Sequence, residues 1–355
     1  MTLEDLGYHD ELEEYRLKNG LGDFAIGRVI AEHKERYIIK NADNEFEAEI
    51  TGNLRYSAQE RTDYPAVGDW VAFSIFDETK GLIHAIFPRH SLLERKAVGK
   101  TSDKQIIAAN IDYALIIQAV DRDFNINRLE RYLTLCYTSN VRPIIVLNKI
   151  DLITAQELSE KLAQIDERVT DVPVLAISNQ TRQGYDGLKS VLLNGKTYCL
   201  LGSSGVGKST LLNTLSDSTL MQTKTISAHS DRGRHATTHR ELHLLESGGI
   251  LIDNPGMREV GMADFSAGIS STFDHIVALS GSCKYKNCTH TNEPGCSVRM
   301  ALEKGELDFS GYENYLKMEK EKEHFEMSLV DKRKRDRAFG KMMKDYKKHY
   351  ARPKD

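Results

Sequence analysis

The stretch GSSGVGKST at residues 202–210 and the stretch NKID at residues 148–151 decide the fold of this chain. The first has the pattern of a loop whose backbone N–H groups hold nucleotide phosphates at the N-terminus of a helix. The second has the pattern of a loop that recognises guanine. An ordinary GTPase carries the phosphate loop first and the guanine loop last, whereas here the order is reversed. Because a site is defined by where its groups lie in space, the reversed order predicts a permuted chain with an intact site.

The phosphate loop uses a different residue type for each task. Its three glycines permit a tight turn between a strand at 197–201 and a helix that we expect to begin near Lys208. We expect Lys208 to reach the β and γ phosphates, which makes it a candidate catalytic residue, and Ser209 to bind Mg²⁺. The residues predicted to form the loop are Gly202, Ser203, Ser204, Gly205, Val206, Gly207, Lys208, Ser209 and Thr210.

The stretch NKID predicts which base the site accepts. We expect Asn148 to bond the guanine edge at N7 and O6, and Lys149 to pack across the ring. The Asp151 carboxylate would accept from guanine N1–H and N2–H₂, a donor pair that adenine lacks, so ATP is disfavoured. A backbone N–H in the turn Ser178-Asn179 is expected to reach guanine O6, although Asn179 stands where a small residue is usual.

Two later segments supply the remaining parts of a GTP site. The stretch ILIDNPG predicts a strand that ends in Asp253, three residues before Gly256, which is the DxxG spacing. In this motif we expect Asp253 to hold Mg²⁺ through a water molecule and the N–H of Gly256 to sense the γ-phosphate. The stretch RGRHATTHR at 232–240 offers Thr237 or Thr238 as a further Mg²⁺ ligand, and we assign Thr238.

The residue that orients the attacking water is not the usual one. Many GTPases have Gln directly after the DxxG motif, but Met257 occupies that position and cannot hold water. We take His235, between the phosphate loop and the DxxG motif, as the candidate replacement. The alternative is an exposed loop histidine with no catalytic part.

The sequence pattern of residues 24–87 predicts a small all-β barrel. Short alternating runs are separated by Gly, Asn and Asp, without a long helical pattern among them. Five strands at this spacing fit an OB-fold, whose open face commonly binds oligonucleotides, and SH3-like barrels have the same pattern. The predicted strands are FAIGRVI, RYIIK, EFEAEI, DWVAFSIF and GLIHAIF.

Near residue 110 the pattern changes to that of an α/β sheet. Apolar strands such as YALIIQAV and PIIVLNK alternate with amphipathic helical stretches such as NRLERYLTLCY. Such alternation is typical of a parallel sheet with helices on both faces. Beyond about residue 262 the strands end, and a charged helical segment runs from about residue 312 onward.

Three cysteines and one histidine predict a metal site near the C-terminal end. They lie in a stretch rich in Gly, Asn, Thr and Pro that can wrap around an ion. Three thiolates and one imidazole complete a tetrahedral shell with no open position, so we predict one structural Zn²⁺. Cys136 and Cys199 are predicted to be core residues. The four predicted zinc ligands are Cys283, Cys288, His290 and Cys296.

Composition limits the class of protein. A chain of 355 residues is long enough for two or three domains. Its net charge of −4 conceals a basic segment, because residues 332–354 contain 11 Lys and Arg against two Asp, a net of +9. This segment favours a polyanionic partner such as nucleic acid, or is a solvated terminus. The N-terminal residues lack a signal-peptide pattern and no apolar run approaches 18 residues, so we expect a soluble cytoplasmic protein with no membrane partner.

Together these features resemble the RsgA (YjeQ) family, bacterial GTPases that depend on the small ribosomal subunit. The resemblance covers about residues 20–350 and includes IAANIDYALIIQAV, FNINRLERYL and RGRHATTHR. It implies a circularly permuted P-loop GTPase core, an N-terminal OB-fold barrel and a C-terminal zinc-binding, mainly helical domain. Two positions depart from the family pattern, Asn254 for the usual Thr and Ala236 in a switch that usually reads HTTT, and we expect them to affect rate more than function.

The resemblance also implies a function. Such a protein hydrolyses GTP with Mg²⁺, is stimulated by the small ribosomal subunit, and acts in late maturation of that subunit. It binds rRNA through the OB-fold and the zinc domain and is released after hydrolysis. We expect a monomer. The implied domains are an N-terminal extension (1–20), the barrel (21–95), the permuted GTPase domain (96–262) and the zinc-binding domain with its basic tail (263–355).

Two other classes of protein share part of this pattern. A metabolic P-loop enzyme such as a kinase would not explain NKID or the barrel. A zinc-stabilised nucleic-acid-binding protein with a vestigial nucleotide site would not explain why Lys208, Asp253 and Asp151 are all intact.

Overall fold

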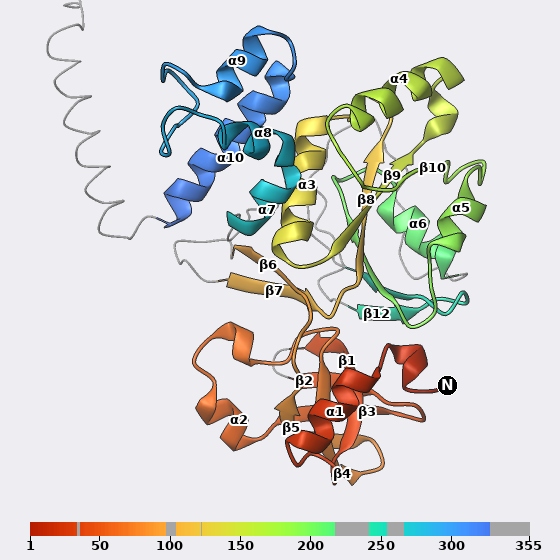
Figure 1. The fold of residues 1–355 in the computed structure, drawn as a ribbon. Coiled ribbons are helices and arrows are strands. Elements are labelled where there is room, and N and C mark those ends of the chain that lie inside the picture. Colours follow the sequence, from red (N-terminus) through yellow and green to blue (C-terminus); the bar gives the residue numbers. More distant parts are fainter. Residues whose placement is uncertain (34–35, 97–103, 122, 217–240, 254–265, 327–355) are drawn as a thin grey trace, which may run out of the picture. The chain divides into compact units, whose positions relative to one another are not determined.

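The computed structural model divides the chain into two compact units, Met1–Ala263 and Asp264–Asp355. The first unit contains a sheet of eleven strands in the order β10-β9-β8-β11-β13-β12-β1-β2-β3-β5-β4 and a separate pair, β6-β7 (Figure 1). The described part of the second unit is helical. The structure describes residues 1–33, 36–96, 104–121, 123–216, 241–253 and 266–326.

Five strands of the first unit close into a barrel. Neighbours pair in the order β1-β2-β3-β5-β4, and β4 pairs back with β1. This order, with β3 and β5 parallel, is that of an OB-fold and excludes the SH3-like alternative. The elements are β1 (Ala25–His33), β2 (Arg36–Lys40), β3 (Glu45–Ile50), α2 (Gly52–Ser57), η2 (Arg61–Asp63), β4 (Trp70–Asp77) and β5 (Lys80–Ile86).

Alternation along the strands decides which side chains enter the barrel. In β3, Phe46, Ala48 and Ile50 are buried, and the glutamates between them are exposed. The buried residues join Tyr37 and Phe73 in the barrel core. The period-two pattern therefore predicted these strands correctly.

The residues before β1 pack against the barrel. They form η1 (Glu4–Leu6) and α1 (Asp10–Lys18), which are connected to the barrel by a second buried cluster. The segment predicted as an extension thus covers apolar surface of the barrel, while the boundary at residue 20 stays a prediction. The buried residues of this cluster are Leu6, Tyr8, Leu12, Ile26, Trp70, Ala72 and Phe87.

The other half of the large sheet is an α/β core. Strands β10, β9, β8, β11 and β13 are parallel, and β12 lies antiparallel beside β13. In this order β8 alone separates β9 from β11, so the two motif-bearing strands lie close together. The elements are β8 (Tyr113–Ala119), α3 (Ile126–Thr138), β9 (Arg142–Asn148), η3 (Ile150–Leu152), α4 (Ala155–Asp166), β10 (Val174–Ala176), α5 (Tyr185–Ser190), β11 (Thr197–Leu201), α6 (Lys208–Leu215), β12 (Glu241–Leu244) and β13 (Ile250–Asp253).

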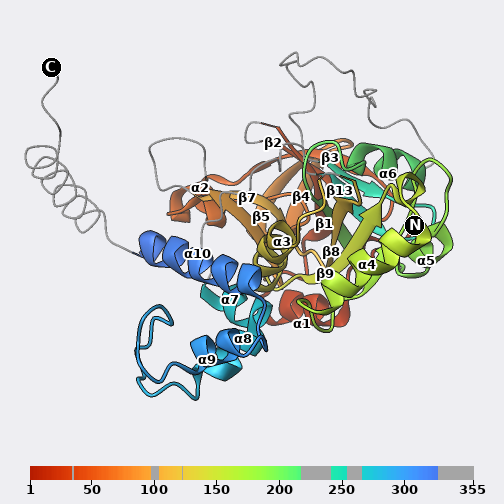
Figure 2. The ribbon, with the colours of Figure 1, turned by 90° about the horizontal axis from the view of Figure 1, so that it is seen from above.

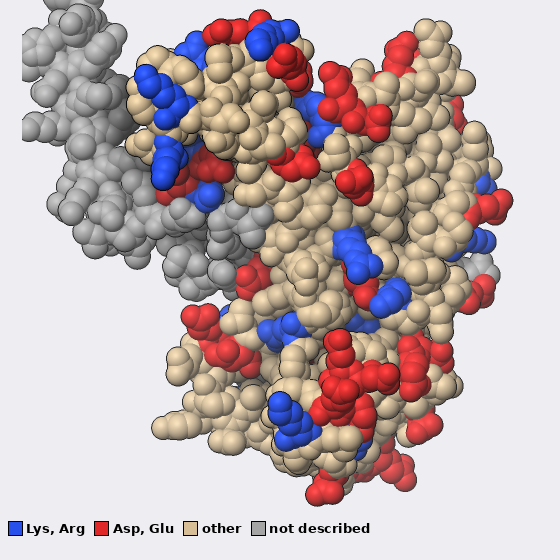
Figure 3. Space-filling model, viewed as in Figure 1, with Lys and Arg blue, Asp and Glu red and all other residues tan. Residues whose placement is uncertain are grey.

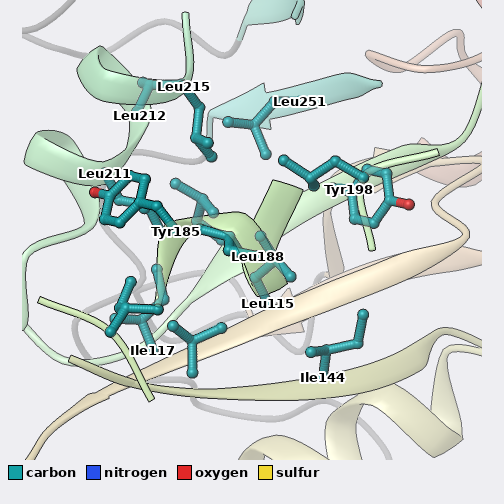
Figure 4. Close-up of a cluster of buried hydrophobic side chains, with 14 of the residues drawn as sticks. Leu115, Ile117, Ile144, Tyr185, Leu188, Tyr198, Leu211, Leu212, Leu215 and Leu251 are labelled. Atoms are coloured by element: carbon teal, nitrogen blue, oxygen red, sulfur yellow. The ribbon is translucent and has the colours of Figure 1, made fainter. Parts of the chain in front are cut away.

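Helices cover both faces of this core, as the sequence predicts. On one face α5 and α6 pack onto Leu115, Ile117 and Leu251 in a buried cluster (Figure 4). On the other face α3 packs against β8 and β9 (Figures 1 and 2). Burial of these large apolar side chains stabilises the core and fixes the strand ends that carry the motifs.

A buried arginine joins the barrel to the core. Arg28 on β1 donates to the backbone carbonyls of Gly68 (3.0 Å), Leu6 (2.6 Å) and Asn110 (3.0 Å). Burial lowers the pKa of Arg28 to about 10, so the guanidinium stays charged at neutral pH. Strand β1 also pairs with β12 of the core. The connecting chain contains the antiparallel pair β6 (Leu92–Lys96) and β7 (Lys104–Ala109).

The described part of the second unit consists of short helices around one long helix. Phe273 packs edge-on against Tyr315, with ring centroids 5.5 Å apart. The predicted basic segment, 332–354, lies outside the described residues. Among described residues of both units, no helix has the length and apolar character needed to span a bilayer. The helices are α7 (Ser266–Thr272), α8 (Asp274–Ser280), α9 (Ser297–Glu303) and α10 (Phe309–Glu326).

Candidate nucleotide and metal sites

The C-terminal ends of the parallel strands bring the sequence motifs to one edge of the core sheet. Asn148 is the last residue of β9, and Asp253 is the last residue of β13. The phosphate loop follows β11, and the turn Ser178-Asn179 follows β10. Open parallel sheets bind their ligands at this edge. The fold therefore collects motifs that are far apart in the sequence.

Two glycines let the phosphate loop pass close to its neighbours. Gly202 has a φ of 141°, and a Cβ there would lie 2.2 Å from the carbonyl oxygen of Ile117. Gly207 has a φ of 101°, and a Cβ there would lie 2.3 Å from Nδ2 of Asn148. A side chain at either position would be strained and would displace the loop from β8 or from the NKID motif.

The ammonium group of Lys208 is held by the phosphate loop itself. Its Nζ donates to the carbonyl oxygens of Gly202 (2.7 Å) and Ser203 (2.6 Å). Lys208 is also the first residue of α6, so an anion at this helix end meets backbone N–H groups and the ammonium together. Because phosphate oxygens are stronger acceptors than neutral carbonyls, the side chain can exchange its partners for a bound phosphate.

Asn148 ties the NKID motif to the phosphate loop. Its side-chain amide donates to the carbonyl of Val206 (2.7 Å), and its Oδ1 accepts from the backbone N–H of Asn179 (3.2 Å). The side chain is 1% exposed, so these bonds are shielded from water. One residue therefore fixes the relative positions of three loops.

Asn179 makes a second link between the same loops. Its Nδ2 donates to the carbonyl of Gly207 (2.9 Å), and its Oδ1 accepts from the hydroxyl of Tyr185 on α5 (2.8 Å). From the sequence alone Asn179 is only a departure from the usual small residue, and this bridge was missed. The signal for this bridge in the sequence was the residue type itself, because a side-chain amide can donate one hydrogen bond and accept another at the same time.

Asp151 lies in η3 with its carboxylate exposed and oriented by a neighbouring serine. Its Oδ1 accepts from the hydroxyl of Ser178, and that hydroxyl oxygen accepts from the N–H groups of Gln180 (3.2 Å) and Thr181 (3.1 Å). A carboxylate has lone pairs for several donors, so Asp151 can also accept a pair of ligand N–H groups.

Lys149 braces the motif from the other side. Its backbone is left-handed, with a φ of 68°, and its Nζ pairs with Oδ2 of Asp121 at 2.9 Å. Asp121 follows β8, so the pair connects the loops after two neighbouring strands.

The remaining predicted phosphate-loop residues lie in two places. Ser203, Ser204, Gly205 and Val206 lie in the turn between β11 and α6, and Ser209 and Thr210 lie in the first turn of α6.

Part of the predicted site lies outside the described residues. Thr238 and Gly256, predicted to act at Mg²⁺ and the γ-phosphate, belong to this part, and so does the candidate catalytic residue His235. The backbone of Asp253, the last residue of β13, belongs to the described part of the chain.

The second unit brings the four predicted zinc ligands together. The ligand atoms of Cys283, Cys288, His290 and Cys296 all lie within 4.8 Å of one another. Nδ1 of the histidine is 3.6 Å from Sγ of Cys283 and 3.5 Å from Sγ of Cys296. A tetrahedral zinc ion with bonds of about 2.0–2.3 Å separates its ligands by about 3.3–3.8 Å. The cluster therefore has the ligand types and spacing to hold a metal ion.

Hydrogen bonds hold the loop that carries these ligands. His290 has a left-handed φ of 62°, and its carbonyl accepts from the hydroxyl of Tyr312 on α10 (2.8 Å). The Glu293 carboxylate accepts from the backbone N–H groups of Thr289 (2.9 Å) and Thr291 (3.0 Å). Hydrogen bonds from Thr289 lower the pKa of Glu293 to about 2, so it stays ionised and keeps these bonds at neutral pH.

The other two cysteines are confirmed as core residues. Cys136 on α3 and Cys199 on β11 are fully buried. Burial raises the pKa of the Cys199 thiol to about 12, and it also raises that of Cys136. Both side chains are therefore neutral apolar groups at physiological pH.

Comparison with known proteins decides the family. The family model for the RsgA GTPase matches residues 86–263. A protein of Lactiplantibacillus plantarum, small ribosomal subunit biogenesis GTPase RsgA 2, is 41% identical over 331 residues, which cover 92% of this chain and 93% of that protein. The chain belongs to the RsgA GTPase family. A further RsgA relative, from Methanosarcina acetivorans, is 36% identical over 98% of this chain and 94% of its own length.

Solved structures agree with the RsgA fold. YloQ, described as a circularly permuted GTPase, is 25% identical with a TM-score of 0.62, over 86% of this chain and 97% of that chain. YjeQ from Thermotoga maritima is 24% identical with a TM-score of 0.65, over 84% and 98%. An ABC transporter model matches residues 185–342, which include the phosphate loop and exclude the NKID motif. The permuted P-loop core predicted from the reversed motifs is confirmed.

Proposed function

We propose that this member of the RsgA family hydrolyses GTP at the edge of its core sheet and acts in late maturation of the small ribosomal subunit. The observation that carries the proposal is the pair of bridges made by Asn148 and Asn179, which join the guanine motif and the phosphate loop into one site. The relatives named for small ribosomal subunit biogenesis support the biological role.

In this proposal the NKID side holds the base. Asn148 and the backbone N–H of Asn179 bind the N7 and O6 edge, and Lys149 packs across the ring. Asp151, oriented by Ser178, accepts from N1–H and N2–H₂ of guanine. Adenine presents no such donor pair, so GTP is preferred to ATP.

The phosphate side holds the triphosphate and Mg²⁺. Lys208 and the backbone N–H groups of residues 202–210 bind the phosphates. Ser209 and Thr238 would bind Mg²⁺, which neutralises charge between the phosphates, with Asp253 acting through water. The Gly256 N–H would sense the γ-phosphate. His235, in place of the usual Gln, would orient the attacking water.

We further propose that the cysteine and histidine cluster holds one structural Zn²⁺, because three thiolates and an imidazole leave no open position. The OB-fold barrel and the zinc domain would bind rRNA, and GTP hydrolysis would release the protein from the subunit. We place the domains at 1–20, 21–95, 96–262 and 263–355, and propose a cytoplasmic monomer.

Small ribosomal subunits are expected to raise the rate of GTP hydrolysis at least about tenfold. The free protein should be slow because Met257 stands where many GTPases have Gln. Phosphate release with purified small subunits tests this, with large subunits as the control.

A GTP analogue should tighten subunit binding and GDP should loosen it. Equal rates with either subunit, or equal affinities in the two nucleotide states, would contradict the proposed role.

A further inference from the structure

Helix α3 reaches the phosphate loop through a side chain that the nucleotide motifs do not include. Nη1 of Arg128 donates to Oγ of Ser203, the second residue of the loop, over 2.8 Å. This hydrogen bond connects the phosphate loop to α3 through one serine.

Arg128 is placed by a helix that is itself anchored firmly. The Asn125 side chain caps the helix by accepting from the backbone N–H of Arg128 (2.9 Å). Two residues later, the buried carboxylate of Glu130 accepts from Nε (2.9 Å) and Nη2 (2.7 Å) of Arg168. At the other end of α3, Asn140 donates to the carbonyl of His90 in the chain that leaves the barrel (2.8 Å). These contacts leave α3 little freedom to move relative to the sheet.

Ser203 also contributes to the position of Lys208. The carbonyl of Ser203 accepts from Nζ of Lys208 at 2.6 Å, while its hydroxyl accepts from Arg128. Two cationic side chains therefore meet at one residue of the loop, one through the backbone and one through the side chain. A shift of Ser203 would move the loop backbone that is to receive the phosphates.

We propose that Arg128 is a positioning residue that holds the phosphate loop in its binding conformation through Ser203. The inference rests on the proposed binding of GTP at this loop. Arg128 acts on the loop before the nucleotide arrives, so its contribution is the same in the ground state and the transition state. Interactions of this kind lower the Kd of the nucleotide and leave the rate at saturation largely unchanged.

Nucleotide affinity in four variants tests the proposal. We expect Arg128→Ala and Ser203→Ala each to raise the Kd for GTP and for GDP about tenfold, the usual effect of losing one charged hydrogen bond. In Arg128→Ala the turnover rate at saturating GTP should change by less than about threefold. Arg128→Lys, which can still donate one bond, should recover most of the affinity. The matched control is Arg142→Ala, an exposed arginine at the start of β9, whose Kd should equal that of the wild type.

The double variant Arg128→Ala/Ser203→Ala separates positioning from a general effect on stability. If Arg128 acts through Ser203, the double variant binds GTP no more weakly than the single variants, whereas independent effects multiply to about a hundredfold. Multiplying effects, or a wild-type Kd in Arg128→Ala while the wild-type protein binds GTP normally, would overturn the inference and leave the proposed function standing. Failure of the wild-type protein to bind GTP would overturn both.

Discussion

Lys208→Ala is expected to lower the rate of GTP hydrolysis by about 100- to 1,000-fold. The ammonium begins α6 and already lies against the carbonyls of Gly202 and Ser203, at the place where phosphates would enter. A positive group fixed at this place stabilises the charge that develops on the transferred phosphoryl group, and its removal costs about 3–4 kcal/mol of transition-state stabilisation. The fold should persist, because the hydrogen bonds from Nζ of Lys208 to Gly202 and Ser203 lie within the phosphate loop itself.

Single-turnover phosphate release at saturating GTP measures this effect, with thermal unfolding as the check on the fold. The matched control is Lys196→Ala. Lys196 lies immediately before β11, at the end of the strand remote from the phosphate loop, and pairs with Asp112 at 3.2 Å. Normal turnover by Lys208→Ala would place the hydrolytic site elsewhere in the chain.

Removing two zinc ligands should release the metal and unfold the second unit. Structural zinc contributes on the order of 10 kcal/mol to folding, which is comparable with the whole stability of a small domain. Within residues 281–296 only His290 and Cys296 are buried, and both are proposed zinc ligands, so the double variant Cys283→Ala/Cys288→Ala should leave this loop with little apolar packing to order it. We expect about one zinc per chain in the wild type and none in the variant.

Elemental analysis and limited proteolysis test the zinc prediction together. The variant should be cut within residues 264–326 while the first unit stays resistant. Cys136→Ala is the control, because this buried cysteine of α3 lies in the first unit and should leave the zinc content unchanged. Freshly purified wild-type protein without zinc, or a double variant as resistant as the wild type, would contradict the assignment.

Much of the fold could be predicted because the relevant signals are local. The EFEAEI stretch alternates along one strand, so the buried side of β3 follows from its own residues. The phosphate loop needs glycine where a Cβ would strike Ile117 or Asn148, and the motif records that need. The reversed order of the two motifs predicted a permuted core, which the family and the solved structures confirm.

Contacts between distant segments could not be predicted in the same way. Arg28 looks like an ordinary strand arginine, but it is buried and donates to carbonyls of three separate segments. The bridge from Asn179 to Gly207 and the contact from Arg128 to Ser203 join residues that no local pattern relates. Such pairings depend on how complete elements pack, which a single sequence does not record.

Asp151 decides whether the NKID motif recognises the base of a nucleotide whose phosphates bind at residues 202–210, a loop that is far from NKID in the sequence but next to it in the fold. In Asp151→Asn the side chain keeps its size and its place beside Ser178, but it donates where the carboxylate accepted. The amide oxygen can still accept from N1–H, but the amide NH₂ group faces the amino group at C2 of guanine, which loses its acceptor. Xanthine carries a carbonyl in place of the amino group at C2. This carbonyl can accept a hydrogen bond from the side-chain NH₂ group of the variant.

Competition between GTP and xanthosine triphosphate in wild type and Asp151→Asn therefore tests the account most directly, with Asp166→Asn at the exposed end of α4 as the control. We expect the Asp151→Asn variant to lose GTP affinity by about 100-fold or more, to bind and hydrolyse xanthosine triphosphate instead, and to need Lys208 for that reaction. An Asp151→Asn variant that still prefers GTP as strongly as the wild type would contradict it.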